Sequence, residues 1–495
     1  MEANIQQKIG RATKWSSITE IATRLVSPLV NIVLARLLVP SAFGIVATIT
    51  MVISFAEIFT DAGFQKYIIQ HEFKDEEELD KNTNVAFWTN IVVSIIICGV
   101  IFVFRDKIAN IVGNDGLGDS ISIASLLIII AAFSSIQMAR FKRELNFKTL
   151  FYVRIGAALI PLIITIPLAV LLRNYWALLI GNFATNIFNA VILTIKSRWR
   201  PKFFYSFAIF KEMFSFSAWT LLESVSIWLT SNIGIFIVGN HLNEYYLGLY
   251  KTSMSTINSY MGIITSALVP VLFSALSRYQ NDDDNFKKTY YFFQKITAIF
   301  VIPMGVGIFL FSDLVTLVLL GDQWLEASGF IGIWGLTSAI TIVLSHFASE
   351  VFRSKGNPKI SLISQLIHMC ILIPTILISI EYGFEVLYVS RSIVRIELIL
   401  FSIIALKILY KFEILIVVKN IAPAGIASLI MCGVAILLKD LIANLLWQFV
   451  TIGICVLVYF VALFVLFPTV RKEIFELEFV QKLLKKSKSK TKSKM

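Results

Sequence analysis

A stripe of polar side chains interrupts an apolar stretch near the start of the chain. Its members are Glu20, Arg24, Ser27 and Asn31. Their spacing of i, i+4, i+7 and i+11 puts them on one face of a helix. A guanidinium in a low-dielectric cavity is suited to binding anionic phosphate oxygens. A carboxylate on the same face can pair with that cation or bind a coupling cation.

Similar stripes, each with an ionisable residue, occur in three further apolar stretches. One contains Glu57 and Asp61, the next contains Glu223, and the last contains Lys251 and Asn258. Polar groups inside a bilayer usually face a bundle interior or a water-filled cavity. We therefore predict that the four stretches line one central hydrophilic cavity.

Each of these charges also has a structural interpretation. Arg24 can pair with Glu20 one turn away, and Lys251 can extend to the outer interface. Arg391 and Arg395, again four residues apart, can brace the second half of the chain. Contact with a substrate and static internal pairing both fit the pattern, and the sequence leaves the choice open.

The composition places these stripes in a membrane protein. Of the 495 residues 57% are hydrophobic and 15% are charged, whereas globular chains average about 45–50% apolar and about 25% charged residues. This excludes a soluble enzyme and a nucleic-acid-binding protein. The net charge of +12 is instead assigned to basic cytoplasmic loops.

Fourteen apolar stretches are long enough to span a bilayer, which takes about 20 residues each. Of the 44 Lys and Arg residues, 34 lie in or near alternate loops and four lie in the loops between them. By the positive-inside rule both termini are cytoplasmic. The predicted spans are 15–37, 43–63, 83–104, 120–140, 150–172, 175–195, 212–240, 246–275, 289–320, 327–352, 359–380, 384–407, 420–440 and 447–468.

Three sequence landmarks of the first half of the chain recur in the second half in the same order. Spans 1–6 and 7–12 are therefore predicted to be parallel repeats around the central cavity, a transporter architecture. The fold class is an all-α polytopic membrane protein of 14 transmembrane helices, with two extra helices at the C-terminal end. The landmarks are Asn31 with Phe43-Gly44-Ile45 and Asn232 with Leu247-Gly248-Leu249; Arg140 with Asn146-Phe147-Lys148 and Arg353 with Asn357-Pro358-Lys359; and Tyr175 and Tyr382.

The repeat and the last two spans set the predicted domain organisation. Residues 1–200 form an N-terminal six-helix lobe and residues 201–411 a C-terminal one. Residues 412–470 hold spans 13 and 14, and 471–495 form a cytoplasmic basic tail. That tail is either an interfacial helix on anionic membrane lipids or a disordered topology signal.

Sequence signatures of catalysis are missing. The chain has no glycine-lysine phosphate loop, no His/Cys/Asp/Glu set with metal spacing, and no loop long enough for a catalytic domain. We expect neither enzymatic activity nor a metal or cofactor. Na⁺ or H⁺ bound at Glu57, Glu223, Asp61 or Glu20 is the expected coupling ion.

Five motifs within residues 15–200 resemble the polysaccharide-unit flippases of the MOP superfamily, and in particular the WzxC branch. The resemblance includes the fourteen spans, and beyond residue 200 it rests on topology and short pieces such as Leu247-Gly248 with Tyr250. The motifs are Ala35-Arg-Leu-Leu-Val-Pro-Ser-Ala-Phe-Gly-Ile-Val-Ala47, Asp61-Ala-Gly-Phe with Ile68-Ile-Gln70, Ala86-Phe-Trp88, Arg143-Glu-Leu-Asn-Phe-Lys148 and Tyr175-Trp-Ala-Leu178.

This resemblance implies a flippase in the bacterial cytoplasmic membrane. It would carry undecaprenyl-diphosphate-linked oligosaccharides from the inner to the outer leaflet by alternating access, for cell-surface polysaccharide synthesis. Its partners would be that substrate, membrane lipids, a polysaccharide polymerase and glycosyltransferases. Arg24 best matches the headgroup-binding arginines on the first helix of related lipid II flippases. The other expected substrate-binding residues are Lys251, Arg395, Arg391, Asn31 and Asn258.

Three other functions fit parts of the sequence. A cation-coupled multidrug exporter of the same superfamily would use the acidic cavity residues for cationic substrates. A membrane polymerase or ligase of lipid-linked sugars would need outer loops longer than those predicted. A scaffold for a biosynthetic complex is favoured only by the basic tail.

Overall fold

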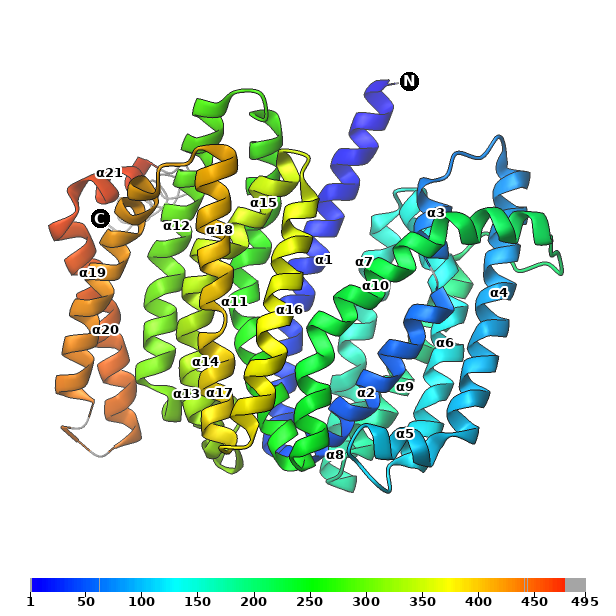
Figure 1. Ribbon diagram of the computed structural model, residues 1–495, viewed down its shortest axis with the longest axis horizontal. Helices are drawn as coiled ribbons and strands as arrows, with labels where there is room; N and C mark the ends of the chain where they lie inside the picture. Colours follow the sequence, from blue (N-terminus) through cyan, green and yellow to red (C-terminus); the bar gives the residue numbers. More distant parts are fainter. Residues whose placement is uncertain (1, 62, 440, 443, 477–495) are drawn as a thin grey trace, which may run out of the picture. The chain divides into compact units, whose positions relative to one another are not determined.

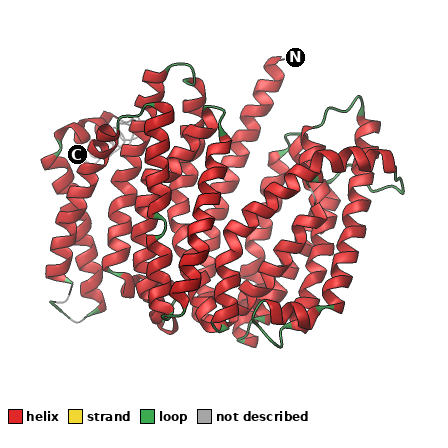
Figure 2. Cartoon of the chain, in the orientation of Figure 1, coloured by secondary structure: helices red, strands yellow, loops and turns green. Residues whose placement is uncertain are grey.

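The computed structural model describes residues 2–61, 63–439, 441–442 and 444–476, and their regular structure is helical (Figures 1 and 2). Within the described part, eleven helices are long and apolar enough to cross a membrane. The number is twelve if the bent pair Glu244–Ser266 and Leu268–Arg278 is one span. The chain is thus a multi-pass membrane protein.

Each of the fourteen predicted spans coincides with helical structure, although the count of fourteen crossings stays a prediction. Two predictions are wrong in detail. The span at 289–320 is interrupted at Phe311, where α12 (Asp283–Leu310) ends before α13 (Ser312–Leu319) begins. The span at 384–407 is not one continuous helix either. It consists of α17 (Phe384–Ile393) and α18 (Ile396–Tyr410), separated by a turn at Val394 and Arg395. The i, i+4 spacing of Arg391 and Arg395 therefore does not put them on one helix face.

The chain divides into two compact units. Unit 1 comprises residues 1–267, 316–330 and 365–394. In it α1 packs against α7, α4 against α6, and α6 against α9. Its helices are α1 (Glu2–Leu37), α2 (Pro40–Asp61), α3 (Phe64–Gln70), α4 (Glu76–Val103), α5 (Arg105–Ile111), α6 (Gly118–Arg143), α7 (Phe147–Ile160), η1 (Pro161–Thr165), α8 (Ile166–Leu172), α9 (Trp176–Lys196), α10 (Phe207–His241), most of α11 (Glu244–Arg278), η2 (Asp322–Ala327), α17 and the end of α16 (Pro358–Ile380).

Unit 2 comprises residues 268–315, 331–364 and 395–495. Its α12 packs against α19, and α19 against α20. Phe286, Tyr290 and Phe412 are buried in its core. Its helices are α12 (Asp283–Leu310), most of α14 (Ser328–Thr341), η3 (Ile342–His346), α15 (Phe347–Ser354), the start of α16, α18, α19 (Ile414–Leu438), α20 (Leu445–Leu466) and α21 (Pro468–Glu476), while α13 (Ser312–Leu319) is shared between the units.

Aspartates begin two of the long helices. Asp75 accepts a hydrogen bond from the Glu78 backbone N–H at 2.7 Å and caps α4. Asp282 accepts one from the Asn285 N–H at 3.1 Å and caps α12. These capping bonds satisfy N–H groups that lack a partner within the helix. The backbone N–H and the side-chain amide of Asn285 both donate to Asp282 and hold the pKa of its carboxyl below the usual range.

Two helix ends in different halves of the chain have the same hydrogen-bond pattern. At the end of α6 the Leu145 N–H donates to the Lys142 carbonyl, and the Asn146 N–H to the Phe141 carbonyl. At the end of α15 the N–H groups of Gly356 and Asn357 donate to the carbonyls of Arg353 and Phe352. Both are Schellman turns, and they lie at equivalent positions of the predicted repeat.

Two glycines at equivalent positions of the predicted repeat make a reciprocal contact. A β-carbon added at Gly44 of α2 would overlap the Glu244 carbonyl of α11. One added at Gly248 of α11 would overlap the Pro40 carbonyl of α2. Gly44 follows Pro40 by the same interval as Gly248 follows Glu244, so the two helix beginnings meet as a local two-fold pair. Only glycine allows backbones to approach this closely.

We predict that Gly44→Val and Gly248→Val each lower the melting temperature of the detergent-purified protein by several degrees. The reason is overpacking against fixed backbone, which costs about 1–3 kcal/mol. Gly99→Val in α4 is the matched control, because nothing lies within 4 Å of an added β-carbon there. Equal melting temperatures for all three variants would contradict the reciprocal contact.

Candidate functional site

Arg24 lies where α1 meets α11. A β-carbon added at Gly262 would overlap its Nη1 atom, so the guanidinium lies directly against the α11 backbone. The Arg24 side chain is 41% exposed. The missing side chain at Gly262 thus leaves room for a cation that is still partly open to a ligand.

Glu20 holds two arginines beside one another. Its carboxylate is 3.8 Å from Arg24 Nε on the same helix and accepts a hydrogen bond from Arg154 Nη1 of α7 at 3.0 Å. Both arginines and the glutamate are between 41% and 46% exposed. Pairs this open contribute little stability, and an anionic ligand can replace the carboxylate at small cost.

Arg154 is the functional candidate that our sequence analysis missed. It lies inside the predicted span 150–172, and a charged residue in a span is itself a signal of function. It has no polar stripe of its own, because its partner is on another helix. Only the packing of α1 on α7 brings Glu20 and Arg154 together.

The other predicted substrate-binding residues of α1 and α11 lie at different positions along these helices. Asn31 is exposed two turns beyond Arg24, and Asn258 is exposed on α11. Lys251 is half-buried and has no hydrogen bond or ion pair among the described residues. It precedes Gly262 by eleven positions, or about 16 Å along the helix. Lys251 therefore lies about three turns of α11 away from the position that the Arg24 guanidinium contacts.

Arg391 and Arg395 contact groups within their own units. In unit 1, Arg391 Nε donates to the Tyr250 hydroxyl at 3.2 Å. In unit 2, Arg395 Nη1 donates to Ser338 Oγ at 2.8 Å, and its guanidinium lies 4.2 Å from the centre of the Trp334 ring. The bracing interpretation therefore describes Arg395 well, since a hydrogen bond and a cation–π contact already hold it.

The predicted acidic residues are only partly described. Glu57 is half-buried on α2, and its carboxylate has no hydrogen bond or ion pair with any described side chain. The side chains of Asp61 and Glu223 lie outside the described ones. Among the described residues no group of three His, Cys, Asp or Glu could hold a metal ion.

Residues of η2, far along the chain, form hydrogen bonds with the C-terminal end of α1. Trp324 Nε1 donates to the Ala35 carbonyl at 2.7 Å, and Gln323 Nε2 donates to the same carbonyl at 2.6 Å. Arg36 Nη2 donates in return to the Val318 carbonyl at 2.7 Å, at the end of α13. These bonds satisfy carbonyls that two helix ends leave unpaired.

A family model described as "Polysaccharide biosynthesis protein" matches residues 33–329. The chain belongs to this family. The resemblance to polysaccharide-unit flippases that the N-terminal motifs predicted is thereby confirmed. The match also continues past the N-terminal motifs, through α10 and α11 to the start of α14.

Two curated relatives of this family member are also similar over most of their length. The succinoglycan biosynthesis transport protein ExoT of Rhizobium meliloti (strain 1021) is 23% identical over 68% of this chain and 68% of its own. The lipopolysaccharide biosynthesis protein WzxC of Escherichia coli (strain K12) is 22% identical over 72% of this chain and 69% of its own.

A solved structure shows the same fold. The lipid II flippase MurJ in an inward closed conformation superposes with a TM-score of 0.73 and 18% identity. The match covers 92% of this chain and 99% of that one.

We predict that the polar face of α1 is wetted by water and the opposite face by lipid. In a variant without Cys98, Cys370, Cys432 and Cys455, Asn31→Cys will react with a membrane-impermeant sulfonate thiol reagent, because thiolate chemistry needs water. Leu29→Cys is the matched control, since Leu29 is 62% exposed but lies on another face. Labelling is read by mass after quenching. Equal labelling of both cysteines would contradict a polar cavity along α1.

Proposed function

We propose that the protein is a flippase for lipid-linked oligosaccharides. It moves undecaprenyl-diphosphate-linked saccharide units from the inner to the outer leaflet of the bacterial cytoplasmic membrane. The observation that carries the proposal is the partly exposed Arg24 side chain with its guanidinium against Gly262, on a MurJ-like fold, in a chain of the polysaccharide biosynthesis family. The printed names of ExoT and WzxC support the polymer class.

The two arginines around Glu20 supply the headgroup chemistry. A guanidinium offers a planar fork of N–H donors that matches two phosphate oxygens at once. Arg24 and Arg154 converge on one carboxylate, so an incoming diphosphate finds two forks already oriented. Glu20 then acts as a stand-in anion that neutralises the arginines between transport cycles.

Unit 2 has an apolar groove that a hydrocarbon chain can fill. It has a volume of about 410 Å³ and lies among α12, α19 and α20, with Pro303, Met304, Met431 and Phe460 in its wall. Within a bilayer an acyl or polyprenyl chain fills such a groove without loss of hydrogen bonds.

Alternating access requires contacts that break. We assign the outer gate to the bonds of Gln323 and Trp324 with the Ala35 carbonyl, and to the reciprocal glycine contact of α2 and α11. The equivalent hydrogen-bonded turns at Asn146 and Asn357 support two parallel repeats that rock against each other. A coupling cation, Na⁺ or H⁺, at Glu57 supplies the driving force.

We predict that Arg24→Ala slows flipping roughly 10- to 100-fold in liposomes. The loss corresponds to one charge-assisted interaction of about 1.5–3 kcal/mol. The substrate is a labelled undecaprenyl-diphosphate oligosaccharide, and its protection from an external sugar-modifying reagent is followed over time. Arg24→Lys should recover only part of the rate, because it keeps the charge but not the fork.

Arg278→Ala, at the exposed end of α11, is the control and should flip at the wild-type rate. A wild-type rate for folded Arg24→Ala would refute the headgroup assignment. No flipping of any such lipid by folded wild type would refute the flippase and favour export of organic cations, measured next as drug resistance of expressing cells.

A further inference from the structure

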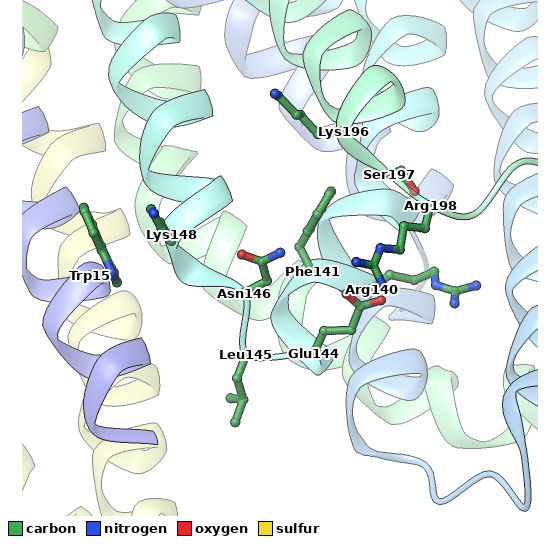
Figure 3. Close-up of a pocket in the computed structure, with 10 residues that line it drawn as sticks. All are labelled: Trp15, Arg140, Phe141, Glu144, Leu145, Asn146, Lys148, Lys196, Ser197 and Arg198. Carbon is green, nitrogen blue, oxygen red and sulfur yellow. The ribbon is translucent and has the colours of Figure 1, made fainter. Parts of the chain in front are cut away.

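A second charged pocket lies apart from Arg24. It has a volume of about 380 Å³ and is formed by the turn between α6 and α7, the end of α9 and Trp15 of α1 (Figure 3). A pocket of this size fits a small ligand or a lipid headgroup. Trp15 precedes Arg24 by nine positions, or about 13 Å along α1, so the two sites are distinct.

The pocket carries more positive charge than its own acids neutralise. Arg140 is nine-tenths buried and is already paired with Asp80 and Glu76 of α4. The other three cations of the lining, Lys148, Lys196 and Arg198, make no ion pair with any described side chain, and Glu144 is the one carboxylate among them. An unneutralised cluster of this kind attracts an anionic ligand.

The equivalent turn of the other half neutralises most of its cations. There Lys355 is 2.7 Å from Asp283, and Arg353 is 3.2 Å from Glu350. Only Lys359, the counterpart of Lys148, is exposed there without an ion pair to a described side chain. The free charge around Lys148 is not a general consequence of this kind of helix end.

Leu145 indicates that the ligand also has an apolar part. Its φ of 56° lies in the left-handed region that favours glycine, and the equivalent residue of the other turn is Gly356 with φ 74°. Leu145 is nevertheless 38% exposed, and its side chain extends away from the charged groups (Figure 3). A left-handed, partly exposed leucine where the other turn has glycine points to contact with something outside the chain.

The aromatic residues place the pocket at the level of lipid headgroups. Trp15 packs against Phe151 and Tyr152, with ring centres 5.0 and 6.1 Å apart. Tryptophan and tyrosine gather at membrane–water interfaces. The turn and the end of α9 belong to loops that the distribution of Lys and Arg predicts to be cytoplasmic.

We infer that this pocket binds the phosphate headgroup of an anionic phospholipid of the inner leaflet. Lys148, Lys196 and Arg198 bind the phosphate oxygens, and Leu145 contacts the first methylenes of an acyl chain. Basic pockets between membrane helices on the cytoplasmic side bind such headgroups. The site fixes α1, α7 and α9 to the leaflet from which a flippase would draw its substrate, and the inference does not depend on that proposed function.

The test measures lipid binding to the full-length, delipidated protein by native mass spectrometry. Phosphatidylglycerol is titrated first and phosphatidylcholine second, and inorganic phosphate is then added as a competitor. We expect the variant Lys148→Gln/Lys196→Gln/Arg198→Gln to lose the tightest phosphatidylglycerol site, with affinity reduced at least tenfold. The charge-matched control Lys359→Gln/Lys407→Gln/Lys419→Gln removes three exposed lysines elsewhere and should keep that site.

Two further variants separate binding from folding. Lys148→Arg/Lys196→Arg/Arg198→Lys keeps the charge and should restore binding. Leu145→Gly relieves the strained turn, so it should melt no lower than wild type yet bind phosphatidylglycerol more weakly. Wild-type affinity in the glutamine variant would overturn the inference, and so would equal loss in the control. Displacement of the lipid by millimolar inorganic phosphate would overturn the lipid assignment. Flipping is not measured here, so these outcomes stand whether or not the protein flips sugars.

Discussion

The high cost of an unpaired charge in hydrocarbon governs this structure. Arg395 is paired with Trp334 and Ser338, and Glu20 lies between two arginines. Charges without a partner must be hydrated, so the polar stripes are expected to face water and not lipid. The same cost explains why Glu20, Arg24 and Asn31 share one face of α1, and why Arg36 on another face donates to the Val318 carbonyl. Fold and candidate site are therefore two results of one constraint.

The sequence predicted the features that depend on nearest neighbours along the chain. Apolar runs located the helices, because a membrane helix needs nothing but length and hydrophobicity. The turn at Val394 and Arg395 was not predictable, because neither residue is a helix breaker. It divides a stretch whose composition predicts one helix.

The candidate site was predicted only where one helix carries it. The spacing of Glu20 and Arg24 reveals their shared face, and the structure confirms that they lie together. Arg154 and Gly262 lie much further along the chain, and no local period connects them to α1. The pocket at Lys148 was missed for the same reason, since its walls come from four separate helices, α1, α6, α7 and α9. These partners could not be predicted because they are far apart in the sequence, not because their interactions are weak.

The reciprocal contact of Gly44 and Gly248 has an evolutionary consequence. The predicted repeat implies a gene duplication, and the halves of a duplicated gene normally diverge independently, position by position. Here each glycine packs on the backbone beside the other, so a larger residue on one side pushes apart both helix beginnings. A substitution at one glycine therefore changes what the other position tolerates. Among descendants of such a duplication the sizes of these two residues should covary, and the pair would preserve a record of the ancestral symmetry after most other positions have lost it.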